Sequence, residues 1–368
     1  MEILKFLFKS FLACVLIAAI ITAGAVFYLK FFGKANIEQM LSKMLGSQIK
    51  FQTMSFNLNE GLVDFKGFTI LNKMEFEENI FKADNFIVLI DKERFEKDRT
   101  FILQEVVVEN GVLTIERNRK GIFNIASAHE EAKPWISGIA YAAEIPAATG
   151  LYDFAKNFKS IVIKNSIINF KDYYVSQTPL TLYCDNFNFQ LKTDPPSNGR
   201  IQANCSMTFR IPMKNPPNGS ASLQASMAIY KDRVDTETTL KTDYIEITLF
   251  RPYFDQYTPF YVNSGSFSST TIFRMHNTVI DCPTTVLFHN LRLATKPGME
   301  NSQFLQTAVN RLAPYLQSGQ GDLYFDFVIK GPAQKPQAGL GPKVKFAIGM
   351  VALEEFSKVM QQLQQYQK

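Results

Sequence analysis

Three successive segments between Leu182 and Tyr230 alternate apolar and polar residues, and turn signals bound each segment. In the clearest one, the odd positions are apolar: Ile201, Ala203, Cys205, Met207, Phe209 and Ile211. Clusters of Pro, Asn and Gly at 193–199 and 215–219 separate the segments. A period of two predicts strands with one apolar and one polar face, and the clusters predict hairpin turns. We therefore expect an antiparallel meander here.

Similar patterns cover most of the chain. Further strands are expected at 49–51, 54–58, 62–70, 86–91, 101–108, 112–117, 161–170, 244–250, 265–275, 280–288 and 321–330, with a turn at Gly111. Apolar residues at helical spacing predict short helices at 36–45 and 302–316 and a terminal helix at 350–368. The predicted fold class is therefore mainly β, with a few capping helices.

One long uncharged segment lies near the N-terminus, at 10–29, with lysines on both sides. Its large apolar residues are Leu12, Val15, Leu16, Ile17, Ile20, Ile21, Val26 and Phe27. This length spans a membrane as a helix, and Lys5 and Lys9 predict a cytoplasmic N-terminus. A retained single-pass anchor is therefore predicted. The alternative is a signal peptide cleaved near Ala23-Gly24-Ala25, and in either case the remainder is exported.

These patterns divide the chain into five parts. They are a cytoplasmic tip and anchor (1–34), a first β segment (35–125), a helical or loop insertion (126–158), a C-terminal run of strands with a helix near 302–316 (159–349), and a terminal helix (350–368). The insertion is Ala-rich and contains Pro134, Pro146 and Gly150. We interpret it as a cap on the sheet, with an amphipathic segment at a membrane surface as the alternative.

The chain contains 33 Phe and one Trp, a large apolar load without hydrogen-bonding groups. The apolar faces of the strands must be covered by another sheet, by helices or by an apolar ligand. Candidate residues for lining a ligand groove are Phe187, Phe189, Leu191, Ile201, Met207, Leu223, Met227, Ile229, Phe267, Phe273, Met275, Val286, Phe288, Leu323, Phe325, Phe327 and Ile329, together with Phe209. The same residues could instead fill an ordinary sandwich core.

Charge and motifs argue against several functions. The net charge of +5 is scattered and forms no basic block, which disfavours nucleic-acid binding. His129, His276 and His289 are far apart and stand in no catalytic or metal-binding motif, so we expect surface or strand-edge residues and no enzyme, cofactor or metal. Cys184 and Cys205 flank a hairpin turn. Parity places Cys184 on the polar face and Cys205 on the apolar face, so three free thiols, with Cys282, are expected.

A set of degenerate motifs follows the predicted anchor in a characteristic order. They are the helix at 36–45, Ile49-Lys-Phe51, Gly61-Leu-Val-Asp-Phe-Lys-Gly-Phe-Thr-Ile70, Val106-Val-Val-Glu-Asn-Gly-Val-Leu-Thr-Ile115, Gly121-Ile-Phe-Asn-Ile125, Ile161-Val-Ile-Lys-Asn-Ser-Ile-Ile-Asn-Phe-Lys-Asp172, Arg251-Pro-Tyr253, Val262-Asn-Ser-Gly-Ser-Phe267 and Phe325-Asp-Phe-Val-Ile-Lys-Gly-Pro332. Their order resembles the AsmA-like family of bacterial envelope proteins, related to TamB and to the bridge-like lipid transfer proteins.

The resemblance implies an elongated, twisted antiparallel β-groove, tethered to the inner membrane with the bulk of the chain in the periplasm. It also implies transfer of phospholipid acyl chains for outer-membrane lipid homeostasis. At 368 residues the chain is short for such a bridge, so another envelope protein is expected to complete it. The alternative function is a structural or assembly factor for outer-membrane protein or envelope biogenesis, with a closed β core.

Overall fold

The computed structural model describes residues 34–351, apart from 126–151, 297–310 and several shorter gaps. The predicted anchor residues, Leu12 to Phe27, lie outside this range, as does the segment 352–368. Within the described part of the chain, no helix has both the length and the apolar character that a membrane crossing requires. The anchor therefore stays a prediction.

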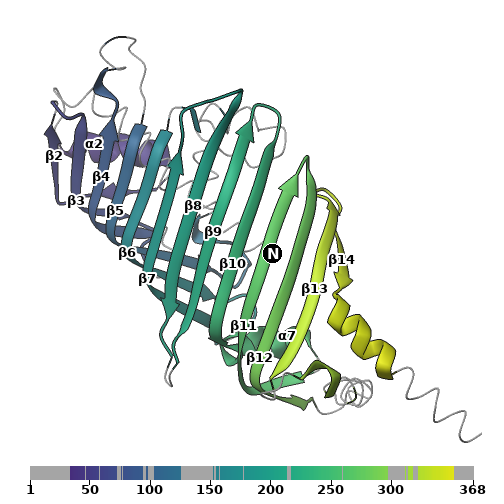
Figure 1. Ribbon diagram of the computed structural model, residues 1–368. Helices are drawn as coiled ribbons and strands as arrows, with labels where there is room; N and C mark the ends of the chain where they lie inside the picture. Colours follow the sequence, from purple (N-terminus) through teal and green to yellow (C-terminus); the bar gives the residue numbers. More distant parts are fainter. Residues whose placement is uncertain are drawn as a thin grey trace, which may run out of the picture. The chain divides into compact units, whose positions relative to one another are not determined.

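The mainly β fold is confirmed (Figure 1). The described residues form a 14-stranded sheet in the order β1-β3-β4-β5-β6-β7-β8-β9-β10-β11-β12-β13-β14, and β2 also pairs with β3. The order has two ends, so the sheet is open. Beyond β3, neighbours in the sheet are also neighbours in sequence, as expected of a meander.

The elements run as follows along the chain. They are α2 (Lys34–Leu45), β1 (Ile49–Lys50), β2 (Thr53–Asn57), β3 (Leu62–Ile70), β4 (Phe81–Ile90), β5 (Leu103–Arg117), β6 (Phe158–Asp172), β7 (Leu180–Thr193), β8 (Arg200–Ile211), β9 (Gly219–Tyr230), β10 (Val234–Glu246), a 3-10 helix (Ile247–Phe250), α7 (Arg251–Tyr257), β11 (Phe260–His276), β12 (Val279–Thr295), β13 (Leu323–Pro332) and β14 (Gln337–Leu340).

Two compact units divide the chain. The first unit comprises Met1–Pro212 and Ser222–Thr236, and the second comprises Met213–Ala221 and Glu237–Lys368. Strands β9 and β10 each contribute residues to both units.

The prediction of a wholly antiparallel sheet is wrong at one place. Strands β5 and β6 pair in parallel, with Val106 opposite Ile161 and Val108 opposite Ile163. The other strand pairs with a described register are antiparallel. A parallel pair needs a crossover connection of a dozen or more residues, and the insertion between β5 and β6 has that length. The change of pattern at 126–158 therefore coincides with the connection between two parallel strands.

The expected turn at Gly111 is also wrong, because β5 continues through this glycine to Arg117. Asn110 adopts a left-handed conformation, with φ of 52°. On β4, Asn85 pairs with Glu109 and Ala83 with Gly111, so pairing resumes directly after the irregular residue. Asn tolerates positive φ better than most residues, and the register with β4 is the same on either side of Asn110. The Asn-Gly pair therefore interrupts the alternation of buried residues along β5 without ending the strand.

The apolar side of the first unit contains two neighbouring rows of residues. Both rows cross six strands on the same face of the sheet. Residues at paired positions share a face of the sheet. We call these twelve residues the N-terminal apolar face: Val63, Val88, Val106, Ile161, Leu191 and Cys205 in one row, and Phe65, Phe86, Val108, Ile163, Phe189 and Met207 in the other. All except the half-buried Met207 are buried. This face is a large part of the core of the first unit.

Helix α2 confirms the short helix predicted at 36–45. Ile37 and Leu41 lie one turn apart and are buried. Two polar side chains of α2 join it to the start of the sheet: Ser42 Oγ accepts from the Ile49 N–H at 2.8 Å, and Glu38 Oε1 accepts from the Phe51 N–H at 3.1 Å. These bonds satisfy backbone donors at the end of β1 and fix the orientation of the helix.

In the second unit, the last described helix begins at 342, earlier than the predicted start at 350. Asp326 of β13 causes this early start, because its carboxylate accepts from the Lys343 N–H at 3.1 Å and the Val344 N–H at 3.0 Å. The first N–H groups of a helix lack partners within the helix, and a carboxylate there is favourable. Val344 and Ala347 then pack with Leu316, Tyr315 and Phe325.

Candidate functional site

The second unit presents its apolar residues on one side of β11, β12 and β13. The register sets Phe288 between Phe267 and Leu323, and sets Val286 opposite Phe325. We call the following set the C-terminal apolar face: Phe267, Phe273, Met275, Val286, Phe288, Leu323, Phe325, Phe327 and Ile329. Strands of period two therefore place all nine predicted lining residues of this unit on one side.

Aromatic rings form a continuous series across this face. The ring centroids of Phe250 and Phe267 lie 6.3 Å apart, those of Phe267 and Phe288 lie 6.4 Å apart, and those of Phe288 and Phe325 lie 5.7 Å apart. The last pair is edge-to-face, an arrangement that stabilises aromatic contacts. The rings are nevertheless not enclosed. Eight of the nine residues are half-buried, and Phe327 is 38% exposed.

The predicted lining residues of the first unit have a different environment. Phe187, Phe189, Leu191, Ile201 and Ile229 are buried. Met207, Phe209, Leu223 and Met227 are half-buried. The apolar residues of β7 and β8 thus belong mainly to the core of their own unit. The eight predicted anchor residues lie outside the described part of the chain, and the structure says nothing of them.

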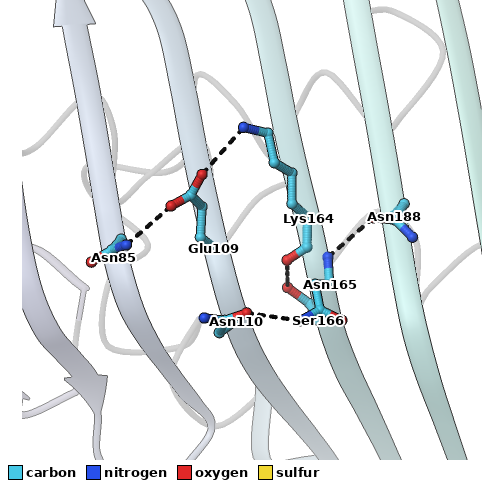
Figure 2. Close-up of polar contacts among 7 residues, drawn as sticks. All are labelled: Asn85, Glu109, Asn110, Lys164, Asn165, Ser166 and Asn188. Atoms are coloured by element: carbon cyan, nitrogen blue, oxygen red, sulfur yellow. Dashed lines mark hydrogen bonds and ion pairs between the residues drawn. The ribbon is translucent and has the colours of Figure 1, made fainter.

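The opposite side of the first unit carries a network of polar side chains (Figure 2). The Glu109 carboxylate accepts from Asn85 Nδ2 at 3.0 Å and from Lys164 Nζ at 3.2 Å. Lys66 Nζ extends the row by donating to Asn85 Oδ1 at 2.8 Å. The Asn85 amide, followed by Lys164, lowers the pKa of Glu109 below its usual value. This row crosses β3, β4, β5 and β6 on the polar face of the sheet.

A second polar row follows the irregular residues of neighbouring strands. Asn110, Asn165 and Asn186 all have positive φ, at 52°, 47° and 49°. Asn165 Nδ2 donates to Asn110 Oδ1 at 2.9 Å, and the Asn165 N–H donates to Asn188 Oδ1 at 3.0 Å (Figure 2). These irregular residues therefore lie on neighbouring strands, and asparagine side chains connect them. The register shifts beside Asn165 and Asn186 mark β-bulges, which bend a strand and increase its twist.

The cysteines confirm one prediction and correct its reasoning. Cys184, Cys205 and Cys282 are free thiols, as expected. Cys184 is nevertheless buried, whereas parity placed it on the polar face. The bulge at Asn186 explains the error, because one extra residue exchanges the two faces of β7. The two thiols are separated along the strands instead, since Cys205 pairs with Leu191 while Asp185, next to Cys184, pairs with Arg210.

Sequence reasoning also missed the setting of His289. It lies inside β12, half-buried, and both ring nitrogens have hydrogen-bond partners. No local motif surrounds it, because its partners come from other strands. The asparagine bulges had a visible signal, since Asn-Gly and Asn-Ser interrupt otherwise regular strand patterns at 110–111 and 165–166.

Comparisons with known proteins add no assignment. A scan against protein-family models, a search of curated proteins and a search of solved structures each found no match to this chain. The residues and their geometry are therefore the observations that bear on function.

Proposed function

We propose that this protein binds phospholipid acyl chains on its C-terminal apolar face and transfers them through the periplasm, tethered to the inner membrane by residues 1–34. The observation that supports binding is the half-buried series of Phe rings on β11, β12 and β13, which remains partly open to solvent. Burying apolar surface stabilises by about 25 cal/mol for each Å² removed from water. The exposed part of this face does not gain that stabilisation. An acyl chain on this face would recover that free energy at about 0.8 kcal/mol for each CH₂ group.

The chemistry of the face also suits movement along it. Dispersion and hydrophobic contacts have no preferred direction, and each contact is individually weak. A chain that moves by one CH₂ group exchanges one set of such contacts for a nearly equal set. Holding and sliding are therefore compatible, and the proposal needs no reaction, cofactor or metal.

The place of the protein in the cell is part of the same proposal. The resemblance to the AsmA-like family supports an inner-membrane anchor, a periplasmic sheet and a role in outer-membrane lipid homeostasis. Because the chain is short for a bridge between two membranes, we propose that another envelope protein completes the path.

The first unit favours a second candidate function. Its apolar rows are buried, and Phe65 and Phe86 have 0% exposure. A dry core of this kind is what a structural or assembly factor requires. In that case the protein would scaffold outer-membrane protein or envelope biogenesis without carrying lipid.

Native mass spectrometry of the full chain, purified in detergent, distinguishes the two functions. We expect phospholipid to co-purify with the wild-type protein and to decrease several-fold in Phe327→Gln. The matched control is Val328→Gln, which changes the neighbouring residue on the opposite side of β13. A lipid-free wild-type protein with a stable protein partner would favour the scaffold. Equal loss of lipid in both variants would show that the effect does not depend on this face.

A further inference from the structure

A serine, a histidine and an aspartate of the second unit form a series of hydrogen bonds. They come from β11, from β12 and from the residue before β13. Ser268 of β11 lies with its Oγ 3.1 Å from Nε2 of His289 on β12. Nδ1 of the same imidazole lies 2.9 Å from Oδ2 of Asp322, the residue before β13. Ser266 pairs with His289 and Phe267 with Phe288, so the three side chains lie on the side of the sheet away from the C-terminal apolar face. They therefore belong to a different surface from the proposed lipid site.

The bonding pattern fixes the proton positions. An ionised carboxylate can only accept hydrogen bonds, so Nδ1 of His289 carries the hydrogen that Asp322 accepts. In the neutral imidazole, Nε2 then presents its lone pair to the Ser268 hydroxyl, which donates to it. This is the order of proton donors that activates a serine in Ser-His-Asp hydrolases, which is recognised by geometry and not by sequence order.

Tyr244 supplies a second, independent observation at the same place. Its backbone has φ of 50°, a strained conformation for a bulky residue. The strained peptide donates its N–H to Ser268 Oγ at 3.1 Å, and the phenol ring stacks on the His289 imidazole with a centroid distance of 4.8 Å and an interplanar angle of 24°. Strain of this kind clusters at functional sites. Tyr244 thus fixes both the serine oxygen and the plane of the histidine.

The site is held firmly but adjoins solvent. The side chains of His289 and Asp322 are 13% and 16% exposed, so water competes little with their hydrogen bond. Tyr244 is 42% exposed and Ser268 is half-buried, so both residues retain some contact with solvent. A substrate could therefore approach Ser268 from the polar face of the sheet.

We infer that Ser268 is an activated nucleophile that forms an acyl intermediate with carboxylic esters. Ser268 Oγ bonds to the ester carbonyl carbon while His289 Nε2 takes the hydroxyl proton. The bond from that carbon to the alcohol oxygen then breaks, and the alcohol leaves with the proton from His289. Water repeats the sequence on the acyl-serine and releases a carboxylic acid, so no oxidant or further reactant is needed. Asp322 is a positioning residue.

A fluorophosphonate probe tests this on the full chain in detergent, because it replaces fluoride by a serine oxygen and leaves a stable adduct. We expect mass spectrometry of the digested protein to locate the adduct on Ser268. The labelling rate should decrease by about a hundredfold or more in His289→Ala and in Asp322→Asn, with partial recovery in Asp322→Glu. A structural role for Asp322 alone would not give that recovery.

Two serines serve as controls. Ser266 pairs directly with His289, and Ser269 hydrogen-bonds Thr242 on the other side of β11. Ser266→Ala and Ser269→Ala should be labelled as fast as the wild type. Folded wild-type protein without an adduct on Ser268, or with a rate that Asp322→Asn leaves unchanged, would overturn the inference. Neither result depends on whether lipid co-purifies, so this test and that of the proposed function fail separately.

Discussion

The two units use the same strand pattern and bury it to different degrees. In the first unit, Val63, Val88, Val106 and Ile161 form a row of 0% exposure across four strands. In the second, most residues of the matching rows are half-buried, although Ile280, Cys282 and Thr284 of β12 are buried. Polar residues such as Ser269, Thr271 and Thr284 interrupt these rows. Alternation therefore determines which side of a strand is apolar. It does not determine what covers that side.

The polar faces of the two units also differ in their hydrogen bonds and backbone conformations. In the first unit, asparagine bulges on neighbouring strands are connected by hydrogen bonds between side chains. Within the strands of the second unit, positive φ occurs at Tyr244, Gly265, Asn290 and Gly331. His289 there bonds Ser268 and Asp322. The first arrangement connects neighbouring strands through side chains, whereas the second places the strained Tyr244 beside a serine.

The largest effect is expected from truncating matched rings of the two apolar faces. Phe86→Ala should lower the free energy of unfolding by about 3–5 kcal/mol, because it leaves a cavity in a fully buried row. Phe327→Ala should cost about 1 kcal/mol or less, since this ring already contacts solvent. Urea unfolding of both variants measures the difference. Equal losses would show that the C-terminal apolar face is as closed as the other.

Thiol labelling tests whether the N-terminal apolar face is closed, and it needs no substitution on that face. Burial raises the pKa of Cys184 and of Cys205 to about 12 from an ordinary value of 9.0. At pH 8 the reactive thiolate is therefore roughly a thousandfold rarer than in an exposed cysteine. In a Cys14→Ser background, iodoacetamide should label these two residues only after urea is added. Fast labelling of the native protein would show that the N-terminal apolar face opens readily.

A moderate effect is expected at the asparagine bulges. Asn165→Ala should lower the free energy of unfolding by about 1–2 kcal/mol, because alanine is strained at positive φ and the bond to Asn110 is lost. Asn165→Gly separates these causes, since glycine adopts this φ freely and loses only the side-chain bond. If thermal unfolding shows the two variants equally destabilised, backbone strain makes no contribution at this bulge.

The smallest effect is expected from acid. The bidentate hydrogen bonds from Arg210 hold the pKa of Asp185 below its ordinary value. A lowered folded-state pKa means that the stabilisation is complete above the unfolded value and is lost as the pH falls through the folded one. Asp185→Asn should therefore flatten the decrease in unfolding midpoint below about pH 4 and remove a little stability at pH 7. An unchanged acid profile would show that this exposed pair contributes nothing.

Much of the fold could be predicted from local patterns. Alternation located most strands, apolar spacing located α2, and the single-sided apolar residues of β11, β12 and β13 do share one side. The errors arose where one residue changes the geometry. The bulge at Asn186 exchanged the faces of β7, and Asn110 interrupted the alternation of β5 where a turn was expected. Helix 342–351 began early because Asp326, distant in sequence, caps it.

The sequence alone determined the period-two strands, the single apolar side and the free thiols, because these follow from bonding between near neighbours and from residue type. Only the tertiary structure decided how deeply each apolar side is buried, that β5 and β6 run in parallel, and that Ser268, His289 and Asp322 meet. These features depend on strands that pair across long stretches of chain. Pairing adds a register, and register determines which distant side chains come within bonding distance.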